Sequence, residues 1–300
     1  MERTYINEAQ KAIGGTVKVQ GFIENLRNSK YMAFIVLKDI TGKLQITVEK
    51  EDHPDLVDTI DKLTPDSVIT VTGKVMENDY VKMGGVEMIP ESIEVESTAN
   101  ALPIVRKEIA ATKKKKAVER SSIDQRIDYR WIDLRTDENQ LMFKAQSCFV
   151  NAMRKFLLDR NFIEIHTPKL IAAASESGSE VFKVDYFDRN AYLAQSPQFY
   201  KQMAMAAGFE RIFETGPVFR AEKSYTNKHA TEFSGFDLEF SYITSYKDVM
   251  AMEEQLLKAG LQAVKDAYGD QIQELFGKEV IVPETPFPVV KLADLYKGLE

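Results

Sequence analysis

The chain has 300 residues, 44% of them hydrophobic, so it can bury a sizeable core and is long enough for about two domains. Its net charge of −7 gives no global signal for nucleic-acid binding, so any RNA contact must come from local basic patches. The single Cys148 excludes an intramolecular disulfide, Met1–Lys11 does not resemble a signal peptide, and no apolar run approaches the ~20 residues that span a bilayer. A cytoplasmic protein without membrane contact is therefore expected.

Residues 1–99 are predicted to form a small β-barrel. Alternating apolar residues separated by turn signals predict five strands, and Asp52–Leu63 is expected to form a helix after the third. The expected strands are Thr16–Ile23, Tyr31–Lys38, Leu44–Glu49, Ser67–Val75 and Val86–Val95. Five short strands with one helix are typical of a closed OB-fold barrel.

One face of this barrel carries candidate residues for binding nucleic acid. Such barrels hold single strands with aromatic and basic side chains. Arg27, Phe34 and Gln45 could supply this face, although Phe34 considered alone fits a core position better.

Residues 100–122 are predicted to form a hinge with a basic face. The segment contains Arg106, Lys107 and the run Lys113–Lys116, without any alternating pattern. Its positive charge could pass close to RNA phosphates. A solvated linker without a partner is the alternative.

Residues 123–300 are predicted to form a second globular domain that begins with a long amphipathic helix capped by Thr136 or Asp137. A short strand and a proline follow within Phe162–Pro168. Further along, Ser245–Asp248 predicts a capping box for a helix that ends near Gly269. The expected buried stripe of the first helix comprises Met142, Ala145, Phe149, Ala152, Phe156 and Arg160.

Two stretches between these helices are candidates for binding an amino acid. Ser175–Glu180 is small and polar, as expected of a mobile loop that closes over a substrate, and Glu176 could hold an ammonium group. Lys201 is expected at the beginning of a helix, where it would pair with an acidic substrate. A surface lysine on a helix is the alternative.

Arg211–Ile243 is predicted to be a hairpin of two strands around the polar loop Lys223–His229. Counting by twos places a set of polar residues and glycines on one face and apolar residues on much of the other. The first set comprises Glu214, Gly216, Val218, Arg220, Glu222, Phe233, Gly235, Asp237 and Glu239. The second comprises Ser234, Phe236, Leu238 and Phe240.

The polar face suits an adenine nucleotide. Arg220 offers a planar fork to a phosphate, Glu222 could accept from an exocyclic amine, and Phe233 could stack on a base. Lys228 and His229 could reach further phosphates. A solvated hairpin with scattered charges is the alternative, and the pattern alone does not decide between them.

The run Phe219–Glu222, followed by His229, Thr231–Phe233, Asp237 and Glu239, resembles motif 2 of class II aminoacyl-tRNA synthetases, in the aspartyl/asparaginyl/lysyl subgroup. The resemblance implies an ATP site in which Arg220 contacts the α-phosphate, Glu222 the adenine edge and Phe233 the adenine face. The ATP-binding residues that it implies are Arg220, Ala221, Glu222, Lys228, His229, Ala230 and Phe233, with Arg220 also catalytic.

Three further segments resemble the same family. Phe162–Pro168 is similar to motif 1, which implies a homodimer, and Gln195–Lys201 has the QSPQ-x-x-K pattern of aspartyl enzymes. The barrel resembles their anticodon-binding domain, with Phe34 stacking on a base. The implied aspartate-binding residues are Glu176, Gln198, Phe199, Tyr200, Lys201 and Arg220. The implied anticodon-binding residues are Arg27, Phe34, Gln45 and Glu87.

The resemblance, to the archaeal/eukaryotic-like aspartyl type, implies an α+β protein in which an OB-fold barrel precedes an antiparallel-sheet catalytic domain with flanking helices. The implied activity is ATP-dependent and Mg²⁺-dependent attachment of L-aspartate to tRNA(Asp), with tRNA(Asn) as an open second substrate. An asparaginyl enzyme is one alternative. A non-catalytic, truncated tRNA-binding protein is another.

A third family motif, a glycine-rich strand and helix ending in an arginine, has no match in the 300 residues. In the family it covers the adenine from the side opposite Phe233, and its acidic neighbours hold Mg²⁺. We therefore assign no metal ligand here and expect these 300 residues alone to be inactive.

Overall fold

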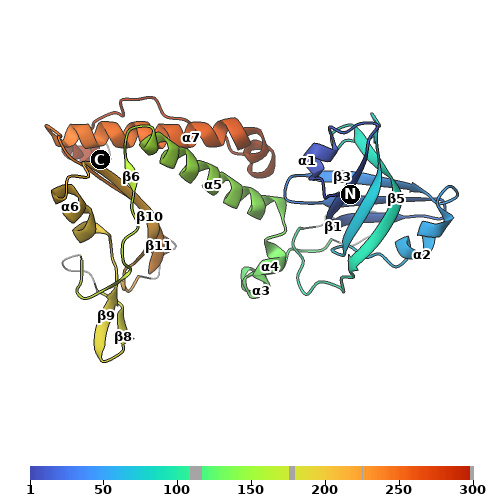
Figure 1. The fold of residues 1–300 in the computed structure, drawn as a ribbon, viewed down its shortest axis with the longest axis horizontal. Helices are drawn as coiled ribbons and strands as arrows, with labels where there is room; N and C mark the ends of the chain where they lie inside the picture. The colour runs from blue at the N-terminus through green and yellow to red at the C-terminus, as the bar shows by residue number, and fades with distance from the viewer. Residues whose placement is uncertain (109–116, 176–179, 225, 227, 298–300) are drawn as a thin grey trace. The chain divides into compact units, whose positions relative to one another are not determined.

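The computed structural model describes residues 1–108, 117–175, 180–224, 226 and 228–297 (Figure 1). It divides into two compact units, Met1–Tyr129 and Arg130–Glu300. The expected α+β class is confirmed, with a five-stranded barrel in the first unit and two three-stranded sheets with helices in the second. Within the described residues, no helix meets the length and apolarity that a membrane crossing requires.

The first unit is the predicted closed barrel, with strand order β1-β2-β3-β5-β4. Its strands are β1 (Thr16–Asn28), β2 (Met32–Lys38), β3 (Lys43–Glu49), β4 (Val68–Glu77) and β5 (Val86–Ser97). Its helices are α1 (Ile6–Ala9), the 3₁₀ turn η1 (Pro54–Leu56), α2 (Val57–Ile60) and α3 (Ile123–Asp128). Two predicted bounds were wrong, because β1 continues to Asn28 past a bulge between Ile23 and Asn25 and the helix expected at Asp52–Leu63 is only η1 and α2.

Strand alternation sets the barrel core. On β2, Ala33, Ile35 and Leu37 are fully buried, whereas Phe34 is half-buried on the outer face. The inward residues of all five strands join one apolar cluster, and Phe34 is not a member of it. The barrel therefore presents Phe34 outward.

The second unit contains two small sheets, ordered β11-β10-β6 and β7-β9-β8. The hairpin strands β10 and β11 pair antiparallel, as predicted, and β6 adds in parallel to β10. The elements are α4 (Arg130–Asp133), α5 (Asp137–Leu158), β6 (Ile163–Glu164), β7 (Leu170–Ile171), β8 (Lys183–Tyr186), β9 (Arg189–Leu193), α6 (Gln198–Ala206), β10 (Arg211–Phe219), β11 (Glu232–Phe240), α7 (Tyr246–Phe276) and α8 (Leu292–Lys297).

Helices α5 and α7 lie side by side against the apolar face of the hairpin (Figure 1). Phe236 of that face stacks on Phe213, with ring centres 5.9 Å apart. The approach of the helices depends on Gly260, because a Cβ there would lie 2.6 Å from Phe149 Cε2. The predicted apolar face is confirmed, since Phe236, Leu238 and Phe240 all pack on this core.

Helix caps were predicted better than helix faces. Thr136 caps α5 and Ser245 forms the predicted capping box at the start of α7. However, α7 continues through Gly269 and ends where Gly277 adopts a left-handed φ of 62°. Glycine in a helix interior costs only about 1 kcal/mol, so Gly269 need not end the helix. The predicted stripe of α5 was also partly wrong, because the buried residues are Leu141, Met153 and Leu157, while Met142 and Arg160 are exposed.

A buried ion pair ties the segment after β6 to the hairpin. Glu214, 3% exposed, accepts hydrogen bonds from Thr167 N at 2.9 Å and Thr167 Oγ1 at 2.7 Å. Lys169 Nζ lies 2.8 Å from its Oε1. Burial raises the pKa of the Glu214 carboxyl, but the hydrogen bonds from Lys169 and Thr167 outweigh it and leave the pKa below its ordinary value.

We expect Glu214→Gln to lower the free energy of unfolding of this unit by about 1–3 kcal/mol at pH 7. A pKa that is lower in the folded than in the unfolded state gives stability above the unfolded value, about 4.3, which is lost as pH falls through the folded value. Urea unfolding at pH 7 and pH 3 measures the loss of unfolding free energy and its dependence on pH. The control is Glu279→Gln, which removes an exposed partner of Lys265. An equal loss at both pH values would contradict the prediction.

Candidate functional site

The polar face of the β10–β11 hairpin brings predicted site residues together. The two strands pair without a register shift, so that Gly216 lies opposite Gly235 and Val218 opposite Phe233. Asp237, four residues beyond Phe233, is on the same face because side chains alternate along a strand. The predicted sharing of faces is confirmed within the two strands, from Glu214 to Val218 and from Phe233 to Glu239.

Arg220 and Phe233 form one end of this face. The guanidinium carbon of Arg220 lies 5.5 Å from the centre of the Phe233 ring, within cation–π range. The backbone N–H of Arg220 donates to Thr231 O at 2.9 Å, which fixes the backbone. Arg220 Nε is buried and has no hydrogen-bond partner among the described residues. A buried guanidinium N–H without a partner is suited to binding an anion.

Lys201 lies at the other end. This residue belongs to the first half of α6 and is 7% exposed, and its ammonium donates to Asp237 and lies 3.3 Å from Glu239. The expected position near the beginning of a helix is confirmed, and the alternative of a surface lysine is wrong. Sequence analysis missed that Asp237 and Glu239 pair with this lysine, although their alternation with apolar residues on β11 placed them on one face.

The glycine pair lies between these ends, with other side chains against it. A Cβ on Gly235 would lie 3.7 Å from Val218 Cγ2, and one on Gly216 would lie 3.6 Å from both Glu214 Oε1 and Lys169 Cε. Asp237 and Phe233 are four residues apart on β11, a separation of about 13 Å. The face thus presents an arginine beside an aromatic ring at one end and a buried lysine with two carboxylates at the other.

The remaining predicted ATP-binding residues lie on the hairpin loop. Arg220 and Glu222 follow the end of β10, so their expected place within the strand was wrong: the ladder continues for only one hydrogen bond beyond Phe219. Ala221 is half-buried and bonds Glu180 O through its N–H at 3.1 Å. The exposed residues of the loop include Glu222, Lys228, His229 and Ala230.

The predicted aspartate-binding residues are only partly described. Glu176 lies outside the described residues. Gln198, Phe199 and Tyr200 form the first turn of α6 before Lys201, and Phe199 is 50% exposed. Gln195, fully buried, accepts from Ser175 N at 3.2 Å and so holds the start of the predicted loop.

The predicted anticodon-binding residues share the outer face of the barrel. Arg27 lies opposite Phe34 across β1 and β2, and Gln45 lies opposite Glu87 across β3 and β5. Gln45 Nε2 is 3.3 Å from Glu87 Oε2. Arg27 is exposed, whereas the other three are half-buried. The four residues come from four strands.

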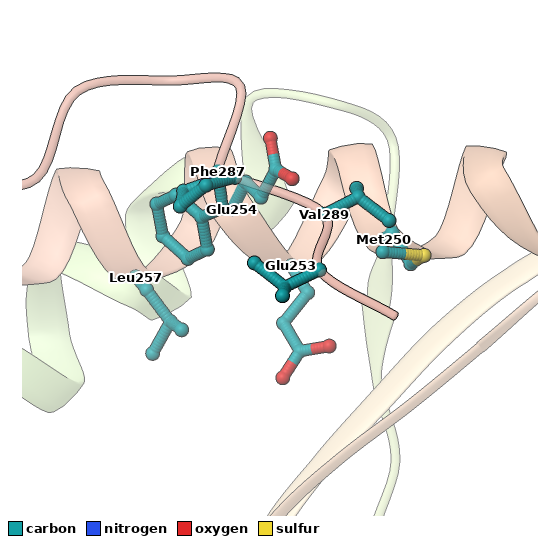
Figure 2. Close-up of a pocket in the computed structure, with 8 residues that line it drawn as sticks. Met250, Glu253, Glu254, Leu257, Phe287 and Val289 are labelled. Carbon is teal, nitrogen blue, oxygen red and sulfur yellow. The ribbon is translucent and has the colours of Figure 1, made fainter. Parts of the chain in front are cut away.

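A cavity of about 370 Å³ lies elsewhere in the second unit, between α7 and the segment that follows it (Figure 2). Met250, Glu253, Glu254 and Leu257 of α7 face Phe287 and neighbouring residues of that segment. None of the predicted site residues lines it. Within the described residues there is no group of three or more His, Cys, Asp or Glu side chains suited to holding a metal ion.

Comparison with known proteins matches both units. Residues 122–299 match the family model of class II tRNA synthetases (D, K and N), and residues 17–96 match that of the OB-fold nucleic-acid-binding domain. An aspartate–tRNA(Asp/Asn) ligase of Methanopyrus kandleri is 43% identical over 91% of this chain and 62% of its own length. An aspartate–tRNA(Asp) ligase of Picrophilus torridus is 41% identical over 91% of this chain and 61% of its own.

Solved structures agree with this assignment. The asparaginyl-tRNA synthetase of Pyrococcus horikoshii in complex with asparaginyl-adenylate superposes with a TM-score of 0.87 and 28% identity, over 100% of this chain and 67% of that one. The aspartyl-tRNA synthetase of Entamoeba histolytica superposes with a TM-score of 0.81 and 29% identity, over 100% of this chain and 63% of that one. The chain spans less than two thirds of the length of the two curated relatives above. It belongs to the class II tRNA synthetases of the aspartyl, lysyl and asparaginyl group.

Proposed function

We propose that this chain carries the ATP-binding, aspartate-binding and anticodon-binding parts of an aspartate–tRNA ligase. One observation carries the proposal, namely the order of residues along the hairpin face. Buried Lys201 lies at one end, the glycine pair in the middle, and Arg220 beside Phe233 at the other end. Aspartate would lie near the lysine, the α-phosphate near the arginine and the adenine near the ring. An aspartyl-adenylate would thus span the face between these residues, past the Glu214–Lys169 ion pair beside Gly216.

Activation needs little proton chemistry from the protein. The aspartate carboxylate is already deprotonated, so it attacks the α-phosphorus, a new C–O–P linkage forms, and pyrophosphate leaves with the electron pair of the broken P–O bond. Arg220, whose buried Nε has no hydrogen-bond partner in the described part of the chain, would neutralise charge that develops on the phosphate oxygens. The aspartyl group then passes to the 3′ end of the tRNA, with AMP as the leaving group.

The family implies ATP together with Mg²⁺. The residues present suit ATP but do not suit the metal ion. Arg220 and Phe233 suit the nucleotide, whereas the described residues offer no cluster of oxygen ligands for the ion. We therefore assign no ligand and no step to Mg²⁺. As partners we propose tRNA(Asp), with tRNA(Asn) as a second substrate, and a cytoplasmic homodimer through the segment around Phe162–Pro168.

The second candidate is an asparaginyl enzyme. Two carboxylates, Asp237 and Glu239, surround the single ammonium of Lys201, which weakens its attraction for an acidic substrate. The fold also matches an asparaginyl synthetase closely. Against this, the QSPQ-x-x-K run and the two curated relatives described above favour aspartate.

The first prediction of this proposal concerns substrate choice. Isothermal calorimetry should show aspartate binding at least about tenfold more tightly than asparagine, equivalent to about 1.4 kcal/mol. Lys201→Met should erase the difference, because a buried substrate carboxylate without a partner is costly. The matched control is Lys265→Met, which removes a lysine paired outside the site. Equal or reversed preference in the unmodified chain would support the asparaginyl candidate instead.

A further prediction concerns the barrel. The chain should bind an anticodon stem-loop containing GUC weakly, with strong dependence on salt. Phe34→Ala and Phe34→Leu should both weaken binding by about 1–3 kcal/mol, because both remove the stacking ring, as measured by fluorescence anisotropy. Thermal melts serve as the control. If Phe34→Leu binds normally, or if either variant unfolds the barrel, the stacking role is wrong.

The last prediction concerns activity of these 300 residues by themselves. Phe233 covers a base from one side only, and no sequence match to the glycine-rich third motif is present to cover the other. A purified polypeptide of residues 1–300 should therefore neither exchange pyrophosphate into ATP with aspartate nor charge tRNA. Aspartate-dependent exchange above a no-enzyme background, lost in Arg220→Ala, would refute this.

A further inference from the structure

The cavity between α7 and the segment that follows it is large enough for a small organic molecule (Figure 2). Its volume is about 370 Å³, and ligand pockets in proteins begin at about 300 Å³. One wall consists of four residues of α7, Met250, Glu253, Glu254 and Leu257. They recur at positions i, i+3, i+4 and i+7, so they share one face of the helix. Residues 287–290 form the other wall.

Two features restrict this second wall. Three of the residues from 283 to 288 are prolines, whose rings fix the backbone φ. Gln255 Nε2 of α7 also donates to Thr285 Oγ1 at 3.0 Å, which ties the segment to the helix. A wall restricted in this way lowers the entropic cost of binding, because the ligand has little of it to order.

The carboxylate of Glu254 distinguishes this cavity from a purely apolar one. Glu254 lines the cavity and is only 8% exposed. In the described part of the chain, no group donates a hydrogen bond to this carboxylate or forms an ion pair with it, and this includes Lys258, one turn further along α7. A buried carboxylate is costly unless a cation or a donor accompanies it. A ligand for this cavity should therefore carry a cation.

A second carboxylate, that of Glu253, belongs to the same wall. Glu253 is exposed, and among the described residues it likewise has no ion-pair partner. Figure 2 shows the side chains of Glu253 and Glu254 pointing in different directions, with their carboxylates apart. One compact cation therefore suits only one of the two carboxylates, whereas two cations joined by an apolar chain suit both. The remaining lining is apolar and comprises Met250, Leu257, Phe287, Pro288, Val289 and Val290.

We infer that this cavity binds a linear aliphatic diamine. One ammonium would donate to Glu254, because an ammonium group has three donors and no acceptor. The methylene chain would pack on Phe287 and Leu257, which removes apolar surface from water. The second ammonium would lie near Glu253, where the cavity is more accessible. The site is distinct from the hairpin face, since no residue of β10 or β11 lines it. The inference therefore does not depend on the proposed function.

The experiment compares three cations by isothermal calorimetry on the full 300-residue chain. Putrescine is the diamine, butylamine is the monoamine of the same chain length, and Mg²⁺ is a compact dication without a methylene chain. Putrescine should bind about threefold more tightly than butylamine, because only the diamine also reaches the exposed carboxylate of Glu253. Mg²⁺ at the same ionic strength should not displace putrescine, because it cannot reach both carboxylates at once.

Three glutamine variants locate the site. Glu254→Gln keeps the shape of the side chain and should weaken putrescine binding about tenfold, because it removes a buried charged partner. Glu253→Gln should weaken it about threefold, since that carboxylate is exposed. The matched control is Glu274→Gln, which removes the same charge from an exposed position of α7 outside the cavity and should leave binding unchanged.

Several outcomes would overturn the inference. It is wrong if putrescine does not bind, if butylamine binds as tightly, or if Mg²⁺ displaces putrescine. It is also wrong if Glu254→Gln weakens binding no more than Glu274→Gln, because putrescine would then respond only to the net negative charge of the chain. Should Glu254→Gln fail to fold in a thermal melt, Glu253→Gln against the same control decides alone. None of these results bears on the hairpin face, so the proposed function stands or falls separately.

Discussion

The polar face of the second unit depends on the register between β10 and β11. With Gly216 opposite Gly235, one face of the pair carries the site residues and the other carries Phe213 and Phe236 of the core. Because the period of a strand is two, a slip of one residue would turn the phenylalanines toward solvent and bury the carboxylates. The core contacts of α5 and α7 thus select the register, and the register in turn assembles the site.

Much of this arrangement is local in sequence and could be predicted. Alternation along each strand identifies both faces of the hairpin, and the Ser245–Asp248 pattern identifies the start of α7. The end of α7 was missed because two glycines, Gly269 and Gly277, carry the same local signal, and only the second adopts a positive φ. Which one ends the helix is decided by what packs along its length, and this is not a property of the local sequence.

Contacts between residues far apart in the sequence were harder to predict. Lys201 and Asp237 are 36 positions apart, and Gln45 and Glu87 are 42 apart. Alternation can tell which face each residue occupies, but the partner depends on how strands and helices pack. In the barrel, β3 and β5 pair over only two residue positions, and one of them is Gln45 with Glu87. So short a pairing leaves little pattern in the sequence.

The position of Arg220 over Phe233 has a consequence for the thermodynamics of binding. A phenyl ring has two faces, and the guanidinium lies over one of them. Under the proposed function, an incoming base would have to take the opposite face or displace the cation. Displacement forfeits a cation–π contact of about 0.5–1 kcal/mol, which a bond from the same guanidinium to phosphate would offset. In the proposed function the arginine would exchange one partner for another on binding, and its net contribution to affinity would be smaller than its contact with phosphate alone would suggest.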